Sequence, residues 1–363
     1  MTLLAGLMLV ASGCSSGSHP AATSPRTGTA TTPGATATTA APGSHSSGCV
    51  DDGRLGGLTT GWVQMVSATT GFAVLNHTIV GTVDGRHWNR LYTAPERLSY
   101  VDAVDANHAW AVGFQTVFTT TDAGRHWVPS PKSEVPLSMV HFIDADHGWG
   151  VHYGTLLQTS TAGRVWQAVP TPCPVDRVCF TDAQHGWLAT HTSVYTTSDG
   201  GSDWRSVLTV RDPAVAQDGV ASDLQCTAGD DAWILFDGRN CGAGSCAYIS
   251  YRCDATGGCV KFTGPASNPG PFSVIDDHTA VFVGFAGPVL NPMSVMFVRD
   301  DGRQRGPAMV VPDGDPAQAS PQGVDFVSPT HGWIVDGALF ESHILGTTDG
   351  GKTWTVQYSA RLP

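Results

Sequence analysis

The stretches TTDAGRHW (120–127) and TTDGGKTW (347–354) share one eight-residue pattern, in which Thr, Asp, glycine and a closing Trp keep fixed places. Three further copies are GTVDGRHW (81–88), TSTAGRVW (159–166) and TSDGGSDW (197–204). The first four closing tryptophans stand about 39 residues apart, close to the length of one β-propeller blade. The pattern therefore predicts an all-β propeller whose turns recur at one phase of each blade.

A second motif recurs in phase with the first and ends in a short apolar run. Its seven copies are TTGFAV (69–74), NHAWAV (107–112), DHGWGV (146–151), QHGWLA (184–189), DDAWIL (230–235), DHTAVFV (277–283) and THGWIV (330–335). An alternating run such as LSYVDAVD (98–105) precedes each copy, and alternation between turn residues indicates a strand. Each repeat is predicted to hold four antiparallel strands, A to D from axis to rim. The seven repeats predict a seven-bladed β-propeller over residues 49–363.

The eight-residue pattern has the chemistry of a tight turn between strands C and D. Its Asp or Thr side chains are expected to accept backbone N–H bonds, and its glycines to adopt backbone angles that other residues resist. The aspartates are Asp84, Asp122, Asp199 and Asp349, and the tryptophans, which pack across the hairpin, are Trp88, Trp127, Trp166, Trp204 and Trp354. The first copy is one residue short, and the third has Thr161 in place of Asp. Residues 254–258 and 300–302 keep only traces of the pattern.

These turns resemble Asp-box, or bacterial-neuraminidase, repeats. The pairing of D-x-x-H-G-W with T-x-D-G-G-x-x-W is most similar to the photosystem II assembly and stability factor family, over roughly residues 58–358. The resemblance implies a propeller fold and the binding of a nascent membrane-protein segment through an arginine-lined face. We carry over the fold and the idea of protein binding, and no individual residue. The sialidase resemblance is limited to the turns, because the chain has no Arg-Ile-Pro-like segment.

The first residues, MTLLAGLMLVASGC, resemble a bacterial lipoprotein signal whose lipidated residue would be Cys14. No Lys or Arg precedes the apolar run, so we expect the true start to lie upstream of Met1. Residues 14–48 are rich in Ser, Thr, Ala and Pro and predict a disordered tether. The predicted organisation is therefore a signal peptide over 1–13, the tether over 14–48 and the propeller over 49–363. It predicts an extracytoplasmic protein held to the bacterial cell membrane by its lipid alone.

Eight cysteines remain downstream of Cys14, an even number that favours disulfides in an exported protein. We predict the short-range pairs Cys173–Cys179, Cys241–Cys246 and Cys253–Cys259, which leaves Cys49 for Cys226, although eight cysteines allow 105 pairings. A metal site is the competing interpretation of the 241–259 cluster, but its spacings are not C-x-x-C. The recurring histidines, among them His108 and His331, are interpreted as turn residues and not as metal ligands. No metal or cofactor is predicted.

The four-strand order places the A–B and C–D turns on one face, and the B–C and D–A loops on the opposite face. Function is expected on the second face, because its loops do not repeat. The candidate binding residues on it are Tyr153, His191, Arg239, Glu341, His343, Arg97, Glu134 and Arg177. A solvated set of loop charges is the alternative interpretation of this group.

The formal net charge of −12 argues against nucleic acid as a partner. No nucleophile elbow, phosphate loop or zinc-helix motif occurs in the sequence. We therefore predict a non-catalytic, monomeric, surface-anchored platform for a protein or a cell-surface glycan. The alternatives are a glycan-binding module and a sialidase-like glycoside hydrolase. Other glycosidases need two facing carboxylates, which the many aspartates of this chain could supply.

Overall fold

The computed structural model describes residue 49 and residues 61–130, 136–212, 215, 219–242, 245–262, 268–285, 293–299, 304–305, 309–310, 320–337 and 341–361. The chain divides into two units, 1–36 and 37–363, and every described residue belongs to the second. The predicted signal peptide, Cys14 and the tether over 14–48 lie outside the described residues.

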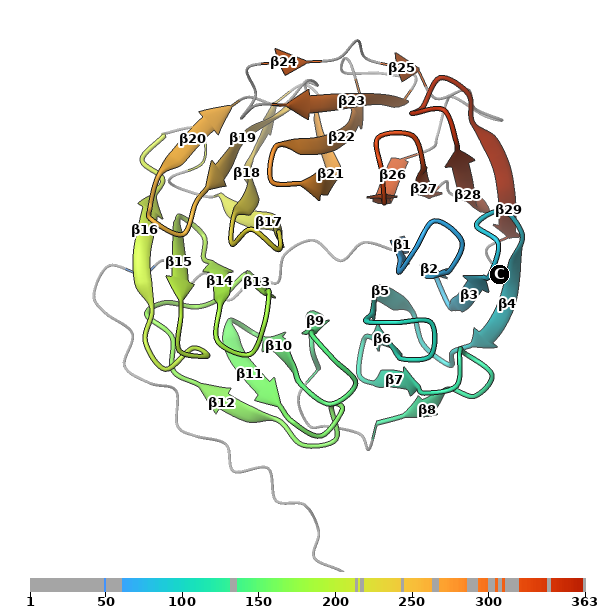
Figure 1. Cartoon of the computed structure of the whole chain (residues 1–363), viewed down its shortest axis with the longest axis horizontal. Coiled ribbons are helices and arrows are strands. Elements are labelled where there is room, and N and C mark those ends of the chain that lie inside the picture. Colours follow the sequence, from blue (N-terminus) through green and yellow to red (C-terminus); the bar gives the residue numbers. More distant parts are fainter. Residues whose placement is uncertain are drawn as a thin grey trace, which may run out of the picture. The chain divides into compact units, whose positions relative to one another are not determined.

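Seven antiparallel sheets follow one another around a central axis (Figure 1), which confirms the predicted seven-bladed all-β propeller. Blade 1 consists of β1 (Gly61–Met65), β2 (Gly71–Leu75), β3 (Thr78–Thr82) and β4 (Trp88–Thr93). Blade 2 consists of β5 (Leu98–Ala103), β6 (Ala109–Gly113), β7 (Val117–Thr120) and β8 (Val128–Pro129). Blade 3 consists of β9 (Met139–Phe142), β10 (Gly148–His152), β11 (Thr155–Thr159) and β12 (Gln167–Val169). Blades 4 and 5 are β13 (Arg177–Phe180), β14 (Gly186–Ala189), β15 (Ser193–Thr197) and β16 (Arg205–Thr209); and β17 (Val220–Cys226), β18 (Ala232–Gly242), β19 (Ser245–Cys253) and β20 (Cys259–Phe262). Blades 6 and 7 are β21 (Asn268–Asp276), β22 (Thr279–Phe285), β23 (Met293–Arg299), β24 (Gln304–Arg305) and β25 (Met309–Val310); and β26 (Ser320–Phe326), β27 (Gly332–Gly337), β28 (Glu341–Thr347) and β29 (Thr355–Arg361).

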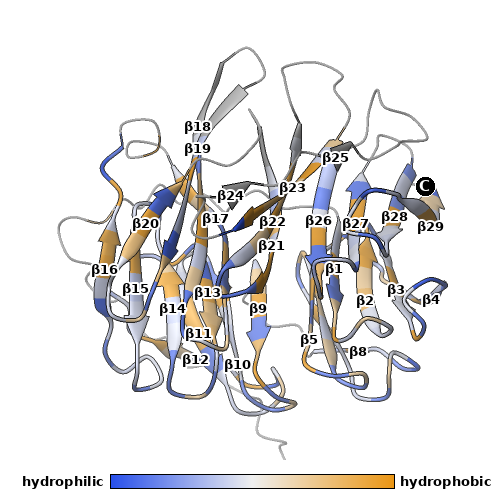
Figure 2. Ribbon diagram, turned by 45° about the horizontal axis from the view of Figure 1, so that its top comes forward, coloured by the Kyte–Doolittle hydropathy of each residue, from blue (hydrophilic) through white to orange (hydrophobic). Residues whose placement is uncertain are grey.

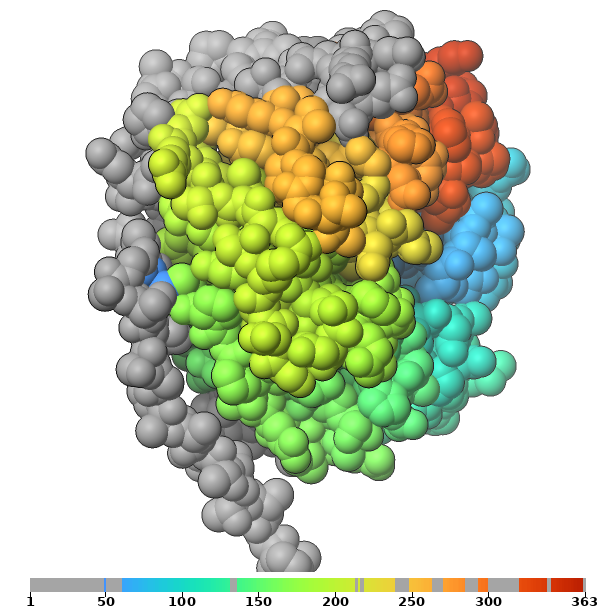
Figure 3. All heavy atoms as spheres, turned by 60° about the vertical axis from the view of Figure 1, so that its left-hand side comes forward, coloured from blue at the N-terminus to red at the C-terminus, as the bar shows by residue number. Residues whose placement is uncertain are grey.

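Each blade runs from axis to rim in chain order, as predicted, and burial follows that order. The second strand is fully buried, as in β2 and β6, whereas half of the residues of the outermost strand β4 are exposed. Blade 6 differs at its rim, where β24 and β25 both pair with β23. The apolar residues concentrate in the strands (Figure 2), and blades 3 to 6 pack side by side along the wall (Figure 3).

The predicted hydrogen bonds of the eight-residue turn are present between the third and fourth strands. In blade 2, Thr120 Oγ1 accepts the Gly124 N–H at 2.9 Å and Asp122 Oδ1 accepts the His126 N–H at 2.9 Å. Gly124 has φ +79°, a conformation that a side chain would strain. In blade 3 the Thr161 hydroxyl replaces the carboxylate and accepts the corresponding N–H, that of Val165, at 2.9 Å. One small acceptor at this place is therefore sufficient to close the turn.

The recurring histidines belong to the turn between the first and second strands, as predicted. Asp105 Oδ1 accepts the N–H groups of Asn107 and His108 at 2.7 and 2.8 Å, and the His108 ring lies 2.9 Å from the same carboxylate. This turn contacts the eight-residue turn of its own blade, since the Ala123 N–H donates to the Asn107 carbonyl at 3.2 Å. Both turns therefore lie on one face, which we call the turn face. The opposite face, with the B–C and D–A connections, is the loop face.

Aromatic rings fill the space between neighbouring blades. Trp110 of β6 is fully buried and stacks on Phe142 of the next blade with ring centroids 3.6 Å apart. Trp166, from the eight-residue turn of that next blade, packs against Phe142 in a T-shaped arrangement with ring centroids 6.1 Å apart. Trp149, Phe180 and Trp204 repeat this arrangement one blade later. The two tryptophan motifs thus serve the core, as the sequence predicted.

One position of each innermost strand links every blade to the next. We call these residues the belt; they are Gln64, Asp102, His141, Cys179, Gln225, Ser273 and Asp325. Each belt residue contacts one residue of the next blade, namely the residue directly after the belt residue of that blade. The contact is to the backbone or to the side chain of that residue. Gln64 Oε1 accepts the Ala103 N–H at 3.1 Å, and Asp102 Oδ2 accepts the Phe142 N–H at 2.5 Å.

The remaining links follow the same rule around the ring. The His141 Nε2–H donates to the Phe180 carbonyl at 2.8 Å, and Cys179 forms a disulfide with Cys226. Gln225 Oε1 accepts the Val274 N–H at 2.9 Å, and Ser273 Oγ accepts the Phe326 N–H at 2.9 Å. Asp325 Oδ2 accepts the Met65 N–H at 2.6 Å. The last link joins blade 7 to blade 1. Each of these two blades is built from its own stretch of chain, so side-chain contacts such as this one close the ring.

Candidate functional site

The innermost strands of all seven blades enclose a cavity of about 470 Å³ on the axis. These strands run from the loop face to the turn face, so residues early in each strand lie nearer the loop face. The belt lies two residues further along and closes the ring below them. Five non-repeating residues line the cavity on its loop-face side; we call Trp62, Tyr100, Arg177, Asp223 and Asp237 the mouth cluster.

Four different blades supply the mouth cluster. Trp62 and Tyr100 come from β1 and β5, and their ring centroids lie 4.7 Å apart. Arg177 is the first residue of β13, and its Nε–H donates to the Ser222 carbonyl of the next blade at 2.9 Å. Asp223 and Asp237 lie on β17 and β18 of that blade. The cluster thus places an aromatic pair beside a group of charges at one opening.

The carboxyls that line the cavity are held in an environment that disfavours their charge. Burial raises the pKa of Asp223 to about 6 and that of Asp237 to about 6, and Arg177 offsets the effect of burial only in part. Burial also raises the pKa of Asp325 to about 6 and raises that of Asp102. The cavity therefore contains more carboxyl groups than its own cations compensate.

Of the predicted binding residues whose side chains the structure describes, Arg177 alone lines the cavity. It is the first residue of β13 and therefore does not lie in a D–A loop. His191 is buried, and its Nδ1 lies 3.1 Å from Asp176 Oδ1. Tyr153 is 58% exposed in the β10–β11 turn, and the Arg97 Nε–H donates to Asn76 Oδ1 at 2.9 Å.

Glu341 and His343 belong to β28, so their predicted loop position is wrong. The long β27–β28 hairpin extends the ladder to these residues, and His343 Nδ1 lies 3.0 Å from Asp336 Oδ1. Glu341 Oε1 accepts the Arg361 Nε–H at 2.9 Å across the sheet. Arg239 likewise lies in strand β18 and not in a loop; its side chain, and all of Glu134, lie outside the described residues.

Trp62, Tyr100, Asp223 and Asp237 were not predicted from the sequence as a group. The signal that could have found the first three is their register, because each precedes its belt residue by two positions and therefore faces the same side of the strand. Asp237 enters from a second strand, β18, which is unusually long.

The disulfide pairing differs from two of the predicted pairs. Cys49 bonds Cys173 and Cys179 bonds Cys226, whereas Cys253–Cys259 is as predicted. A Cys173–Cys179 bond is wrong because five residues lie between the two cysteines, Cys179 itself lies in strand β13, and a strand extends by about 3.3 Å per residue. The β18–β19 register places Cys241 opposite Cys246, but their side chains lie outside the described residues.

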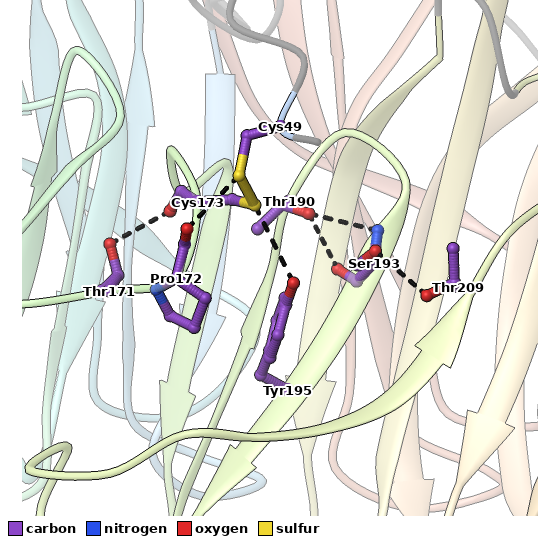
Figure 4. Close-up of a disulfide and its surroundings, with 8 residues drawn as sticks. All are labelled: Cys49, Thr171, Pro172, Cys173, Thr190, Ser193, Tyr195 and Thr209. Carbon is purple, nitrogen blue, oxygen red and sulfur yellow. Dashed lines mark hydrogen bonds between the residues drawn. A yellow bond between two sulfur atoms is a disulfide. The ribbon is translucent and has the colours of Figure 1, made fainter. Parts of the chain in front are cut away.

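The Cys49–Cys173 disulfide ties Cys49, the first described residue, to the connection between blades 3 and 4 (Figure 4). The Tyr195 hydroxyl lies 3.8 Å from Cys173 Sγ, and the Pro172 carbonyl oxygen lies 3.3 Å from Cys49 Sγ. Three disulfides in the described residues indicate an oxidising, extracytoplasmic environment. Within the same residues no helix is both long and apolar enough to cross a membrane.

Known structures share this architecture at low sequence identity. YCF48 bound to D1 peptide is similar with a TM-score of 0.53 and 19% identity, over 72% of this chain and 81% of that chain. YCF48 from Cyanidioschyzon merolae is similar with a TM-score of 0.53 and 17% identity, over 71% and 84% of the two chains. An ancestral GH74 enzyme has a TM-score of 0.60 and 12% identity, over 86% of this chain but 48% of that chain. No family model and no curated protein matches the sequence. These similarities establish the propeller fold alone.

Proposed function

We propose that this chain is a non-catalytic platform that binds another protein at the loop-face opening of its axial cavity. The mouth cluster carries the proposal. Its five residues do not repeat from blade to blade, so the repeat fold does not require them. The acidic and histidine side chains of the turn face, in contrast, bond within their own turns, as Asp105 and His108 do.

The composition of the mouth cluster supports protein binding. Aromatic and arginine side chains at the centre of a concave site are the groups that most often contribute strongly to protein interfaces. Trp62, Tyr100 and Arg177 meet that description. The propeller of YCF48, which has the same fold, was solved with a bound D1 peptide.

A lipid anchor at Cys14 and an extended tether over 14–48 complete the proposal. Such an anchor would keep the propeller outside the cytosol, which agrees with its disulfides. Partition of the full chain into a detergent phase, compared with Cys14→Ser, tests this part. We expect the variant to move to the aqueous phase, and equal partition of both chains would contradict the anchor.

Glycoside hydrolysis is the second candidate. Two carboxyls with pKa values near 6, Asp223 and Asp237, line one cavity, and an ancestral GH74 enzyme has a similar fold. Glycosidases use such pairs, one protonated and one ionised. Turnover of fluorogenic glycosides that disappears in Asp223→Asn would establish this activity and replace the platform proposal.

The deciding experiment is capture of a partner by the full chain from membrane extracts of the parent cell, followed by cross-linking to locate the contact. We expect cross-links at the loop face and roughly tenfold less capture by Tyr100→Ala. Asp203→Asn, an exposed change on the turn face, is the matched control and should capture as the wild type does. Equal capture by Tyr100→Ala, or cross-links confined to the turn face, would overturn the proposal.

A further inference from the structure

We propose that the mouth cluster binds an organic cation, an ammonium or guanidinium group on an aliphatic stem. The charge would meet Asp223 and Asp237, and the stem would lie against Trp62 and Tyr100. The inference rests on the proposed function, because it names the chemical group that a bound partner presents to the cavity.

The charge balance of the cavity is the first argument. Its charged and titratable lining groups, apart from the tyrosine, are Asp102, His141, Arg177, Asp223, Asp237 and Asp325. Four carboxyls thus face one guanidinium and one imidazole. Among the described residues, neither Asp223 nor Asp237 has a cationic partner within ion-pair distance. The Nε–H and Nη1–H groups of Arg177 donate instead to the backbone carbonyls of Ser222 and Asp176, at 2.9 and 2.8 Å.

The hydrogen bonds distinguish the two carboxyls of the mouth cluster from those of the belt. Asp102 and Asp325 each accept a backbone N–H from the next blade. Asp223 Oδ1 accepts the Leu224 N–H at 2.8 Å, and its Oδ2 accepts from Gln225 Nε2 at 3.3 Å. The Ser222 side chain lies near the Asp237 carboxyl, but Asp237 Oδ1 itself is buried without a hydrogen-bond partner among the described residues. A buried carboxylate oxygen in this state costs free energy that an incoming N–H donor would recover.

The aromatic pair supplies the second half of the recognition. The Trp62 and Tyr100 rings lie 4.7 Å apart on the same cavity wall. Ring faces attract ammonium and guanidinium groups and also bury the methylenes of a stem. The cavity volume of about 470 Å³ lies within the range of small-ligand sites. A neutral polar ligand would leave the carboxyls uncompensated, and an anion would be repelled.

Two sources could supply this chemistry, a Lys or Arg side chain of a bound polypeptide and a free alkyl amine. Calorimetric titration of the full chain at neutral pH separates them with three probes. The probes are the peptide acetyl-Gly-Lys-Gly-amide, its neutral counterpart with norleucine in place of Lys, and 1,5-diaminopentane. We expect saturable binding of the Lys peptide, roughly tenfold weaker binding of the norleucine peptide, and proton release on binding.

The variants Asp237→Asn and Asp223→Asn test the site itself. Each variant keeps the shape of the side chain and removes its charge. Each should weaken the binding of the Lys peptide roughly tenfold, while the melting temperature of the protein stays equal or rises. Asp203→Asn should bind as the wild type does. Tighter binding of the diamine than of the peptide would support the cation site and assign it to a free amine.

Three outcomes would overturn the inference. They are equal binding of the Lys and norleucine peptides, wild-type affinity in Asp237→Asn, and no saturation by either cationic probe up to about 10 mM. The proposed function can be tested separately from the cation site. If Tyr100→Ala no longer captures the partner protein but Asp237→Asn still captures it, the platform is supported and the cation site is contradicted.

Discussion

At the residue scale, the belt shows that one position can be served by chemically different side chains. Gln64, Asp102 and Ser273 accept a backbone N–H from the next blade, whereas His141 donates to a carbonyl. What the position requires is a polar group that reaches one strand across, since the backbone groups there are buried and need partners. The residue type is therefore free to vary while the link is kept.

The link between blades 7 and 1 gives a prediction at this scale. Asp325 Oδ2 accepts the Met65 N–H at 2.6 Å, and Asp325→Ala would leave that buried donor without an acceptor. Asp325→Asn keeps an oxygen and removes the charge, so it is the matched control. We expect the Ala variant to be about 1–3 kcal/mol less stable than the Asn variant in urea unfolding. Equal unfolding free energies would mean that this hydrogen bond does not hold the ring closed.

Blade 3 allows the reverse change, because Thr161 stands where the other complete turns have Asp. Its hydroxyl accepts a single N–H, that of Val165 at 2.9 Å. Thr161→Asp should stabilise the turn by about 0.5–1 kcal/mol, since a carboxylate accepts such bonds more strongly. Thr161→Ala removes the acceptor and should destabilise. A lower unfolding midpoint for Thr161→Asp than for the wild type would show that the turn tolerates the hydroxyl better than the charge.

At the element scale, the disulfides act on different levels of the fold. Cys253–Cys259 closes the turn between β19 and β20, where only Asp254 and the glycines of the eight-residue pattern remain. Cys179–Cys226 takes the place of a belt hydrogen bond between two blades. One bond therefore replaces turn chemistry within a blade, and the other replaces a contact between blades.

The lengths of the two loops predict different costs of removal. The Cys179–Cys226 bond spans 47 residues and the Cys253–Cys259 bond spans 6. From loop-closure entropy, the double Ser variant of the first pair should lose about 4 kcal/mol and that of the second about 2 kcal/mol. Denaturant unfolding under non-reducing conditions measures both. A larger loss for the short pair would show that native strain or residual structure in the unfolded chain dominates.

Sequence reasoning succeeded where a feature depends on neighbours along the chain. The strands around Trp110 and the turn at Asp122 follow from periodicity and turn chemistry, which are local. It failed where a feature depends on contacts between blades. Cys179 pairs with Cys226 because Cys179 is a belt residue and Cys226 directly follows the belt residue of the next blade, and no spacing in the sequence shows that. The mouth cluster is equally non-local, because four blades must close into a ring before Trp62 and Asp237 line one cavity.

At the scale of the whole molecule, two sets of carboxyls oppose each other in their response to pH. Inside the ring, burial raises the pKa values of Asp223, Asp237 and Asp325 from 3.8 to about 6. On the turn face, hydrogen bonds within the turns lower the pKa values of Asp122, Asp182 and Asp349 from 3.8 to about 2; His126, His185 and the Thr353 N–H are the leading partners. The pKa values of the two sets in the folded protein therefore lie on opposite sides of their value in the unfolded chain.

The signs of these shifts predict a stability maximum in mild acid. Between about pH 6 and pH 4 the folded ring binds protons that the unfolded chain does not, so stability should rise as the pH falls through this window. Below about pH 4 the turn-face carboxylates bind fewer protons folded than unfolded, so their contribution is lost as the pH falls further. The melting temperature should therefore increase from about pH 8 to pH 5 and decrease below pH 4. Replacing Asp223, Asp237 and Asp325 together by Asn should flatten the rise and leave the acid decline in place. A melting temperature that falls steadily from neutral pH to pH 5 would show that these carboxyls are hydrated and that the axial cavity is open to bulk water.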